Sequence, residues 1–150
     1  MSRVYVNDAP HYLAFEVNAL DYELVKASED SKTSYPRVVV DVINDKLCKH
    51  LKGCYAVVHN RKVVYYGKFS DSVIRRYFRG YSEWSRNGTS QTFMELIHKK
   101  MRAAVINKGY ENFKVYVIKE KHMPKVEPNN AGFEEDVLRN VDFELNVMGN

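Results

Sequence analysis

A chain of 150 residues suits one domain with a hydrophobic core, since a domain of this length buries about 70% of the surface its unfolded form exposes. Hydrophobic residues at 45% and charged residues at 28% exclude a disordered, collagen-like or coiled-coil chain, and no segment approaches the ~20 apolar residues of a membrane-spanning helix. The net charge of +4 is a mild basic bias. Because the N-terminal region has no export signal and Cys48 and Cys54 lack metal-ligand spacing, we expect a cytoplasmic protein with reduced thiols.

The first third of the chain has the composition of strands joined by polar loops. Val4–Val6, Tyr12–Val17 and Val38–Val40 predict strands, and Ile43–Leu51 suits a short helix. Loops are predicted at Lys26–Tyr35 and Asn129–Gly132. No linker is visible, so we expect residues 1–150 to form a single domain in which residues 1–50 are an N-terminal extension packed on the rest.

The clearest local pattern is a β-hairpin. Cys54–Val58 and Val63–Tyr66 are β-branched and aromatic runs separated by a turn. A three-residue loop would place Tyr55 opposite Tyr65, whereas a two-residue loop would pair Tyr55 with Tyr66 and turn Tyr65 to the other face. The local sequence allows both registers, because Asn60 tolerates the left-handed conformation in either turn.

Helical spacing follows the hairpin. Ser70–Ser72 offers N-caps for a helix whose apolar stripe is Val73, Ile74, Tyr77 and Phe78, with Arg75 and Arg79 together on the other side. A second helix is predicted over Thr92–Lys108, with Gly109 as its C-cap, and Lys114–Lys119 predicts the third strand of a central sheet.

A last helix is predicted to begin near Asn129 or Asn130. Glu134 falls within its apolar arc, whereas Glu135 and Asp136 fall outside. A carboxylate on the buried side of a helix is costly unless a cation or hydrogen bonds compensate it, so Glu134 is a candidate functional residue. The alternative is that it reaches solvent or pairs with a lysine at the edge of the core.

Basic residues concentrate in the middle of the chain, interleaved with tyrosines. This arrangement is typical of surfaces that attract phosphates and pack against bases, although a solvated basic face would look the same. The candidate nucleic-acid-binding residues are Lys68, Arg76, Arg79, Lys99, Lys100 and Arg102.

Two tripeptides, Gly53-Cys54-Tyr55 and Tyr65-Tyr66-Gly67, resemble the paired motif that names the GIY-YIG nuclease family. Arg75 resembles the family's helix arginine in spacing and element, and Arg79 stands where the family often has His. The resemblance covers about residues 52–146 and implies an α/β (α+β) fold, in which a small antiparallel three-stranded sheet is flanked by helices and preceded by the N-terminal extension.

The resemblance also implies a function, a metal-dependent endonuclease that hydrolyses phosphodiester bonds in DNA. Tyr55 would be the general base supported by Tyr65, Arg75 would clamp the phosphate, and Glu134 would hold one Mg²⁺ or Mn²⁺ ion. Asn146 fits the place of a further asparagine in that family. The tyrosine role requires a pKa lowered from about 10 to ~7.

Two other readings of the function remain. One is a non-catalytic nucleic-acid-binding module on the same fold, and the other is an interaction protein with no nucleic-acid partner. For a nuclease, the chain has no room for a separate DNA-reading domain. A single nuclease site of the predicted kind cuts one DNA strand. A double-strand break would therefore need a homodimer, a higher homo-oligomer or two visits.

Overall fold

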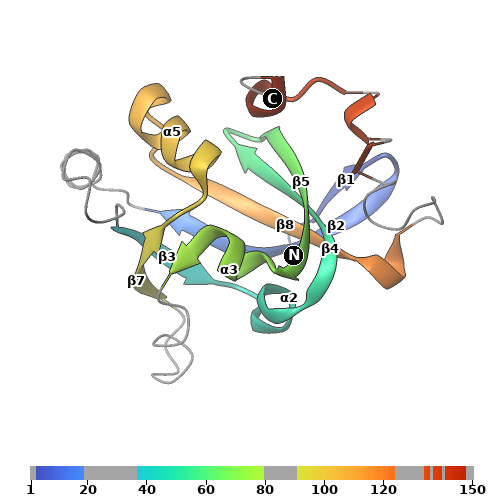
Figure 1. Cartoon of the computed structure of the whole chain (residues 1–150), viewed down its shortest axis with the longest axis horizontal. Coiled ribbons are helices and arrows are strands. Elements are labelled where there is room, and N and C mark those ends of the chain that lie inside the picture. Colours follow the sequence, from blue (N-terminus) through green and yellow to red (C-terminus); the bar gives the residue numbers. More distant parts are fainter. Residues whose placement is uncertain are drawn as a thin grey trace.

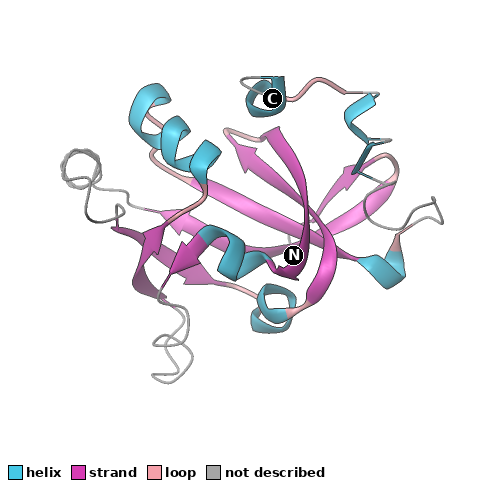
Figure 2. Cartoon of the chain, in the orientation of Figure 1, coloured by secondary structure: helices cyan, strands magenta, loops and turns pink. Residues whose placement is uncertain are grey.

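The architecture is dominated by one antiparallel β-sheet (Figures 1 and 2). The computed structural model describes residues 3–18, 37–79, 91–123, 134–135, 137–139 and 141–147. Within these ranges the sheet has eight strands, seven of them in the order β5-β4-β8-β2-β3-β7-β6, with β1 paired to β2. The strands are β1 (Arg3–Val6), β2 (Ala9–Asn18), β3 (Arg37–Val42), β4 (Leu51–His59), β5 (Lys62–Ser72), β6 (Phe78–Arg79), β7 (Gln91–Leu96) and β8 (Phe113–Lys119).

The helices are short and lie around this sheet. They are α2 (Asp45–Lys49), α3 (Val73–Tyr77), α5 (Lys99–Lys108), the 3₁₀ helix η1 (Glu120–His122) and α7 (Glu144–Val147). Residues 134–135 and 137–139 are also helical. Within the described part of the chain, no helix has the length and apolar character needed to cross a membrane.

The predicted fold class is wrong. The three expected strands exist and are adjacent, in the order β5-β4-β8, but they form one end of an eight-stranded half-barrel sheet and not a small sheet flanked by helices. The physical reason lies in the first third of the chain, where β2 pairs with β8 on one side and β3 on the other. Residues 3–18 and 37–42 thus contribute strands to the same sheet.

The helix predicted over Thr92–Lys108 is half strand. Gln91–Leu96 pairs with β3, and α5 begins only at Lys99. An apolar run with few turn signals suits either a helix or a strand. Here pairing with the Val-rich β3 makes it a strand. The predicted C-cap is confirmed, because Gly109 has φ 70° in the left-handed region.

The arginine helix is shorter than predicted. Ser72 caps α3, its hydroxyl accepting from the Arg75 backbone N–H, but the helix ends at Tyr77. Phe78 and Arg79 then pair with Leu96 and Glu95 across β6 and β7. Arg75 and Arg79 therefore do not share a helix face.

The hairpin starts in the predicted two-residue-loop register and then leaves both predicted registers, so Tyr55 pairs with Gly67. Asn60 and Arg61, with φ of 50° and 65°, form a two-residue turn that pairs His59 with Lys62. An irregularity between Val57 and Val58 then shifts the pairing, which places Val57 opposite Tyr65. Because alternate residues of a strand share a face, Tyr55 and Tyr65 lie on one face without being directly opposite.

The core consists of two clusters. The larger contains Tyr55, Tyr77 and Phe15, and the smaller contains Cys54, Tyr66 and further residues packed beneath the C-terminal segment. Alternation along β4 sends Cys54 and Tyr55 to different clusters. Both cysteines are buried free thiols. The loops predicted at Lys26–Tyr35 and Asn129–Gly132 lie outside the described residues.

Candidate functional site

The two glycines of the tripeptides have a packing reason to be glycine. Gly67 pairs with Tyr55, and a Cβ at Gly67 would lie 2.7 Å from the Tyr55 ring and hydroxyl. Gly53 pairs with Phe69, and a Cβ there would lie 2.3 Å from the Ile118 carbonyl oxygen and 2.7 Å from the Phe69 ring. Each glycine thus leaves room for an aromatic ring on the neighbouring strand.

The Tyr55 hydroxyl is the centre of a polar cluster inside the larger core. It lies 3.1 Å from Nε2 of His98 and 3.3 Å from Nε of Arg76, although Tyr55 itself has no exposed surface. The His98 ring stacks on Tyr77, with centroids 4.2 Å apart, and Tyr65 packs edge-on against it at 5.5 Å. This set of Tyr55, Tyr65, Arg76, Tyr77 and His98 is called the tyrosine cluster below.

The hydrogen-bond directions in this cluster follow from a helix cap. His98 is the N-cap of α5, and its Nδ1 accepts from the Met101 backbone N–H at 3.3 Å. A neutral imidazole with an accepting Nδ1 carries its proton on Nε2, so His98 donates to the Tyr55 oxygen. Arg76 Nε–H also donates to that oxygen. The Tyr55 oxygen therefore accepts two hydrogen bonds.

Electrostatics oppose the predicted role of Tyr55 as a general base. Burial, reinforced by Tyr65, raises the pKa of Tyr55, and the Arg76 guanidinium offsets only part of this effect. Burial followed by the positive charges of Arg76 and Lys100 lowers the pKa of His98 to about 3, so this imidazole is neutral near pH 7. Ionisation of a tyrosine in so enclosed a setting is unfavourable unless a cation compensates it, and Arg76 is the cation in hydrogen-bond contact with Tyr55.

The cluster reaches the surface through Arg76 and Tyr65. Arg76 is exposed overall and Tyr65 is partly buried. Arg76 also lines a polar hollow of about 250 Å³ with Arg75, Phe69 and the Ser70–Ser72 segment. Arg75 is 67% exposed and is paired at 3.9 Å with Asp71, so Arg76 and not Arg75 is the arginine in contact with Tyr55.

Glu134 and Asn146 lie elsewhere, at the outer edge of β5. The Asn146 side chain accepts from the Tyr66 N–H at 2.7 Å and donates to the Tyr66 carbonyl at 2.9 Å. Glu134 accepts a hydrogen bond from the backbone of Lys68, two residues along the same strand. Because β5 is an edge strand, these side chains satisfy backbone groups that would otherwise be open to pairing.

The surroundings of Glu134 combine partial burial with two cations. Burial raises the pKa of its carboxyl, the charges of Lys68 and Arg76 offset part of this effect, and Glu135 adds to it. Among the residues with described positions, no group of three or more His, Cys, Asp and Glu side chains could hold a metal ion. Glu135 is exposed, and Asp136 lies outside the described residues.

The remaining predicted basic residues are spread over several elements. Lys99 is exposed at the start of α5, and the neighbouring Lys100 donates to the Leu145 carbonyl at 3.0 Å. Arg79 lies 3.7 Å from Glu95. Lys68 is exposed on β5, and Arg102 is partly buried on α5. After burial, Arg76 of α3 and Lys100 of α5 both lower the pKa of His98, and we call these two residues with their neighbours Arg75 and Lys99 the α3–α5 face.

Sequence reasoning missed His98 and Tyr77. Tyr77 belongs to the apolar stripe of the helix predicted after Ser70–Ser72. His98 falls in the interior of the helix predicted over Thr92–Lys108. A signal for His98 was available, since a polar residue directly before the Lys99–Lys108 helical pattern occupies an N-cap position. Predicting one long helix over Thr92–Lys108 concealed it.

Comparisons of the chain with protein-family models, with curated proteins and with solved structures gave no match. The GIY-YIG resemblance therefore rests on the sequence motifs alone.

Proposed function

We propose that the protein binds nucleic acid, DNA in the first instance, through phosphate contacts on the α3–α5 face. The observation that carries this proposal is the position of Arg76. Its Nε is fixed by the Tyr55 hydroxyl, while the same side chain lines the open polar hollow beside Arg75. An arginine anchored at Nε is held in a defined position and keeps its other N–H groups for a phosphate.

Charge and chemistry around the hollow support a phosphate ligand. Arg75 and Arg76 line it together with the hydroxyl-bearing Ser70 and Ser72, and Asp71 is its only lining carboxylate among the described residues. Arg76 and Lys100 together create a positive potential strong enough to lower the pKa of His98, after burial. Tyr65, a partly buried member of the tyrosine cluster, provides a ring on which a base or sugar can pack.

A second candidate is cleavage of the bound phosphodiester at the same place. It is favoured by one observation, the contact of Arg76 with the hydroxyl of a tyrosine pair whose rings are 6.0 Å apart. A guanidinium next to a scissile phosphate stabilises charge that develops during hydrolysis. In this proposal Arg76 takes the role first expected of Arg75, and the base is a group other than the enclosed Tyr55. We also propose a cytoplasmic location, which the two free thiols support.

Binding is tested by fluorescence anisotropy of labelled duplex and single-stranded DNA at several salt concentrations. We expect Arg75→Met and Arg76→Met each to weaken binding by about threefold to tenfold and to lower the salt slope by about one unit. Arg139→Met is the matched control, because Arg139 is exposed on the C-terminal helical segment. Equal behaviour of all three variants would end the assignment to the α3–α5 face.

Cleavage is tested by incubating supercoiled plasmid with the protein in Mg²⁺, Mn²⁺ or EDTA. If the protein cuts, Arg76→Met should slow single-turnover cleavage by about a hundredfold or more, well beyond its effect on affinity. Tight binding without nicking under any condition leaves binding as the function.

A further inference from the structure

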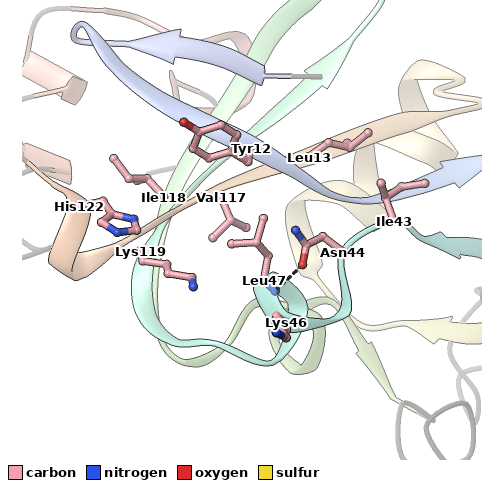
Figure 3. Close-up of a pocket in the computed structure, with 10 residues that line it drawn as sticks. All are labelled: Tyr12, Leu13, Ile43, Asn44, Lys46, Leu47, Val117, Ile118, Lys119 and His122. Atoms are coloured by element: carbon pink, nitrogen blue, oxygen red, sulfur yellow. Dashed lines mark hydrogen bonds between the residues drawn. The ribbon is translucent and has the colours of Figure 1, made fainter. Parts of the chain in front are cut away.

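A second hollow, separate from the α3–α5 face, lies between β2, α2, β8 and η1 (Figure 3). Its volume is about 400 Å³, within the range of small-molecule pockets. Val117 and Leu47 lie in the middle of the view and are 0% and 6% exposed, so they form an apolar floor. None of its lining residues belongs to the tyrosine cluster or to the polar hollow.

Polar and cationic side chains surround this floor (Figure 3). They are Tyr12, Asn44, Lys46, Lys119 and His122. The Asn44 Oδ1 atom is used to cap α2, accepting from the Leu47 N–H at 3.1 Å, which leaves the amide nitrogen as a donor. In the described part of the chain, no carboxylate forms an ion pair with Lys46, Lys119 or His122.

The potential at the rim is positive. Beyond the lining residues, Lys121 and His50 lie near enough to interact, since Lys119, Lys121 and His122 all lower the pKa of His50, after burial. The carboxylate of Asp45 on α2 is 3.0 Å from Lys49 and is thus already paired. Glu120 in η1 is a second carboxylate, adjacent in the chain to Lys119, and its Oε2 atom is buried.

We propose that this pocket binds a nucleoside monophosphate. Two lysines at one rim, Lys46 and Lys119, suit a phosphate dianion better than a single carboxylate. The apolar floor and the rings of Tyr12 and His122 suit a planar base, and the Asn44 amide and Tyr12 hydroxyl supply hydrogen bonds to its edge. The site is independent of the α3–α5 face, so either assignment stands without the other.

The test is a titration of the nitrogen-15-labelled full chain with AMP, GMP, CMP and UMP, followed by amide shifts. We expect saturable shifts at Leu13, Asn44 and Lys119, and weaker or absent shifts with uncharged adenosine. Lys119→Met and Lys46→Met should each weaken AMP binding by about threefold to tenfold. Lys62→Met is the matched control, an exposed lysine at the start of β5.

Any of the following results would overturn the proposal. One is the absence of binding tighter than about 1 mM for all four nucleotides. Another is wild-type affinity in the Lys46→Met/Lys119→Met double variant, provided that its amide spectrum shows a folded chain. The third is equal binding of AMP and adenosine, or saturation of the pocket by octanoate but by none of the nucleotides.

Discussion

The two faces of the β4–β5 hairpin each bury a tyrosine that is hydrogen-bonded to a histidine, but the bonds have opposite directions. On one face, His98 donates from Nε2 to Tyr55, because its Nδ1 accepts from a backbone N–H. On the other, His11 donates from Nδ1 to the Ala9 carbonyl at 2.9 Å, so its Nε2 accepts the Tyr66 proton at 2.7 Å.

The difference separates a structural pair from a candidate functional one. Tyr66 and His11 are closed in by Cys54 and by the C-terminal segment, and Tyr66 also interacts with the thiol of Cys54. Tyr55 instead has Arg76 as a second donor, which connects it to an open hollow. A single neighbouring cation with access to solvent therefore distinguishes the candidate functional pair from the enclosed one.

The largest expected effect is loss of stability in acid, to which both pairs contribute. Burial lowers the pKa of His11 to about 4 and that of His98 to about 3. The unfolded chain, with a histidine pKa near 6.5, binds more protons, so stability falls as the pH drops below 6.5. Each histidine then lowers the free energy of unfolding by about 1.4 kcal/mol per pH unit, which amounts to roughly 5 kcal/mol for both at pH ~4.5.

Urea unfolding at a series of pH values measures this slope. His11→Gln and His98→Gln should each reduce this slope by the contribution of one proton. A slope that neither buried substitution changes would show that these histidines titrate alike in the folded and unfolded chains.

The stability of the protein should be more sensitive to loss of a side chain on the closed face of the hairpin, the face of Tyr66 and His11. Asn146→Ala removes two hydrogen bonds and leaves the Tyr66 N–H and carbonyl without partners, which should cost about 2–3 kcal/mol. It also uncovers an edge strand, so self-association should increase. Urea unfolding and light scattering measure both effects, with the exposed Asn107→Ala as control. A cost below about 0.5 kcal/mol would mean that water replaces Asn146 fully.

On the open face, the face of Tyr55, removal of the tyrosine hydroxyl should cost less stability. Tyr55→Phe leaves the His98 and Arg76 donors unpaired and should destabilise the protein by about 1–2 kcal/mol. Tyr65→Phe, at the partly buried rim, should have little effect on stability. A larger loss of stability for Tyr65→Phe than for Tyr55→Phe would show that Tyr65, and not Tyr55, is the centre of the tyrosine cluster.

The smallest effect is expected at Glu134. A glutamine oxygen can still accept the Lys68 backbone hydrogen bond, so Glu134→Gln should change DNA affinity by less than about twofold and stability by less than about 1 kcal/mol. The measurements are DNA anisotropy with and without Mg²⁺ and thermal unfolding. A Mg²⁺-dependent activity that disappears in Glu134→Gln would restore the metal role first predicted for this residue.

Local patterns predicted the hairpin, the strands near Val4, Tyr12, Val38 and Lys114, the short α2 and the Gly109 cap, because each depends on neighbouring residues. The sheet order was not predictable in this way, since β2 joins β8 through contacts between segments about a hundred residues apart. The same limit applies to the site. Spacing brought Tyr55 and Tyr65 to one face, but only tertiary packing selects Arg76 over Arg75 and adds His98.

Glu134 illustrates a different limit. The helical arc correctly marked it as a partly buried carboxylate. Its partner is the unpaired edge of β5, which is invisible until the strand order is known. A carboxylate placed inward by periodicity can therefore serve backbone pairing as readily as a metal.

The most direct test of the contrast between the two faces is an amide chemical-shift titration of the full chain with short duplex DNA. The account predicts shifts concentrated in Ser70–Arg76 and His98–Lys100, with few at His11, Tyr66 or Asn146. Shifts concentrated around His11, Tyr66 and Asn146, or none anywhere, would contradict it.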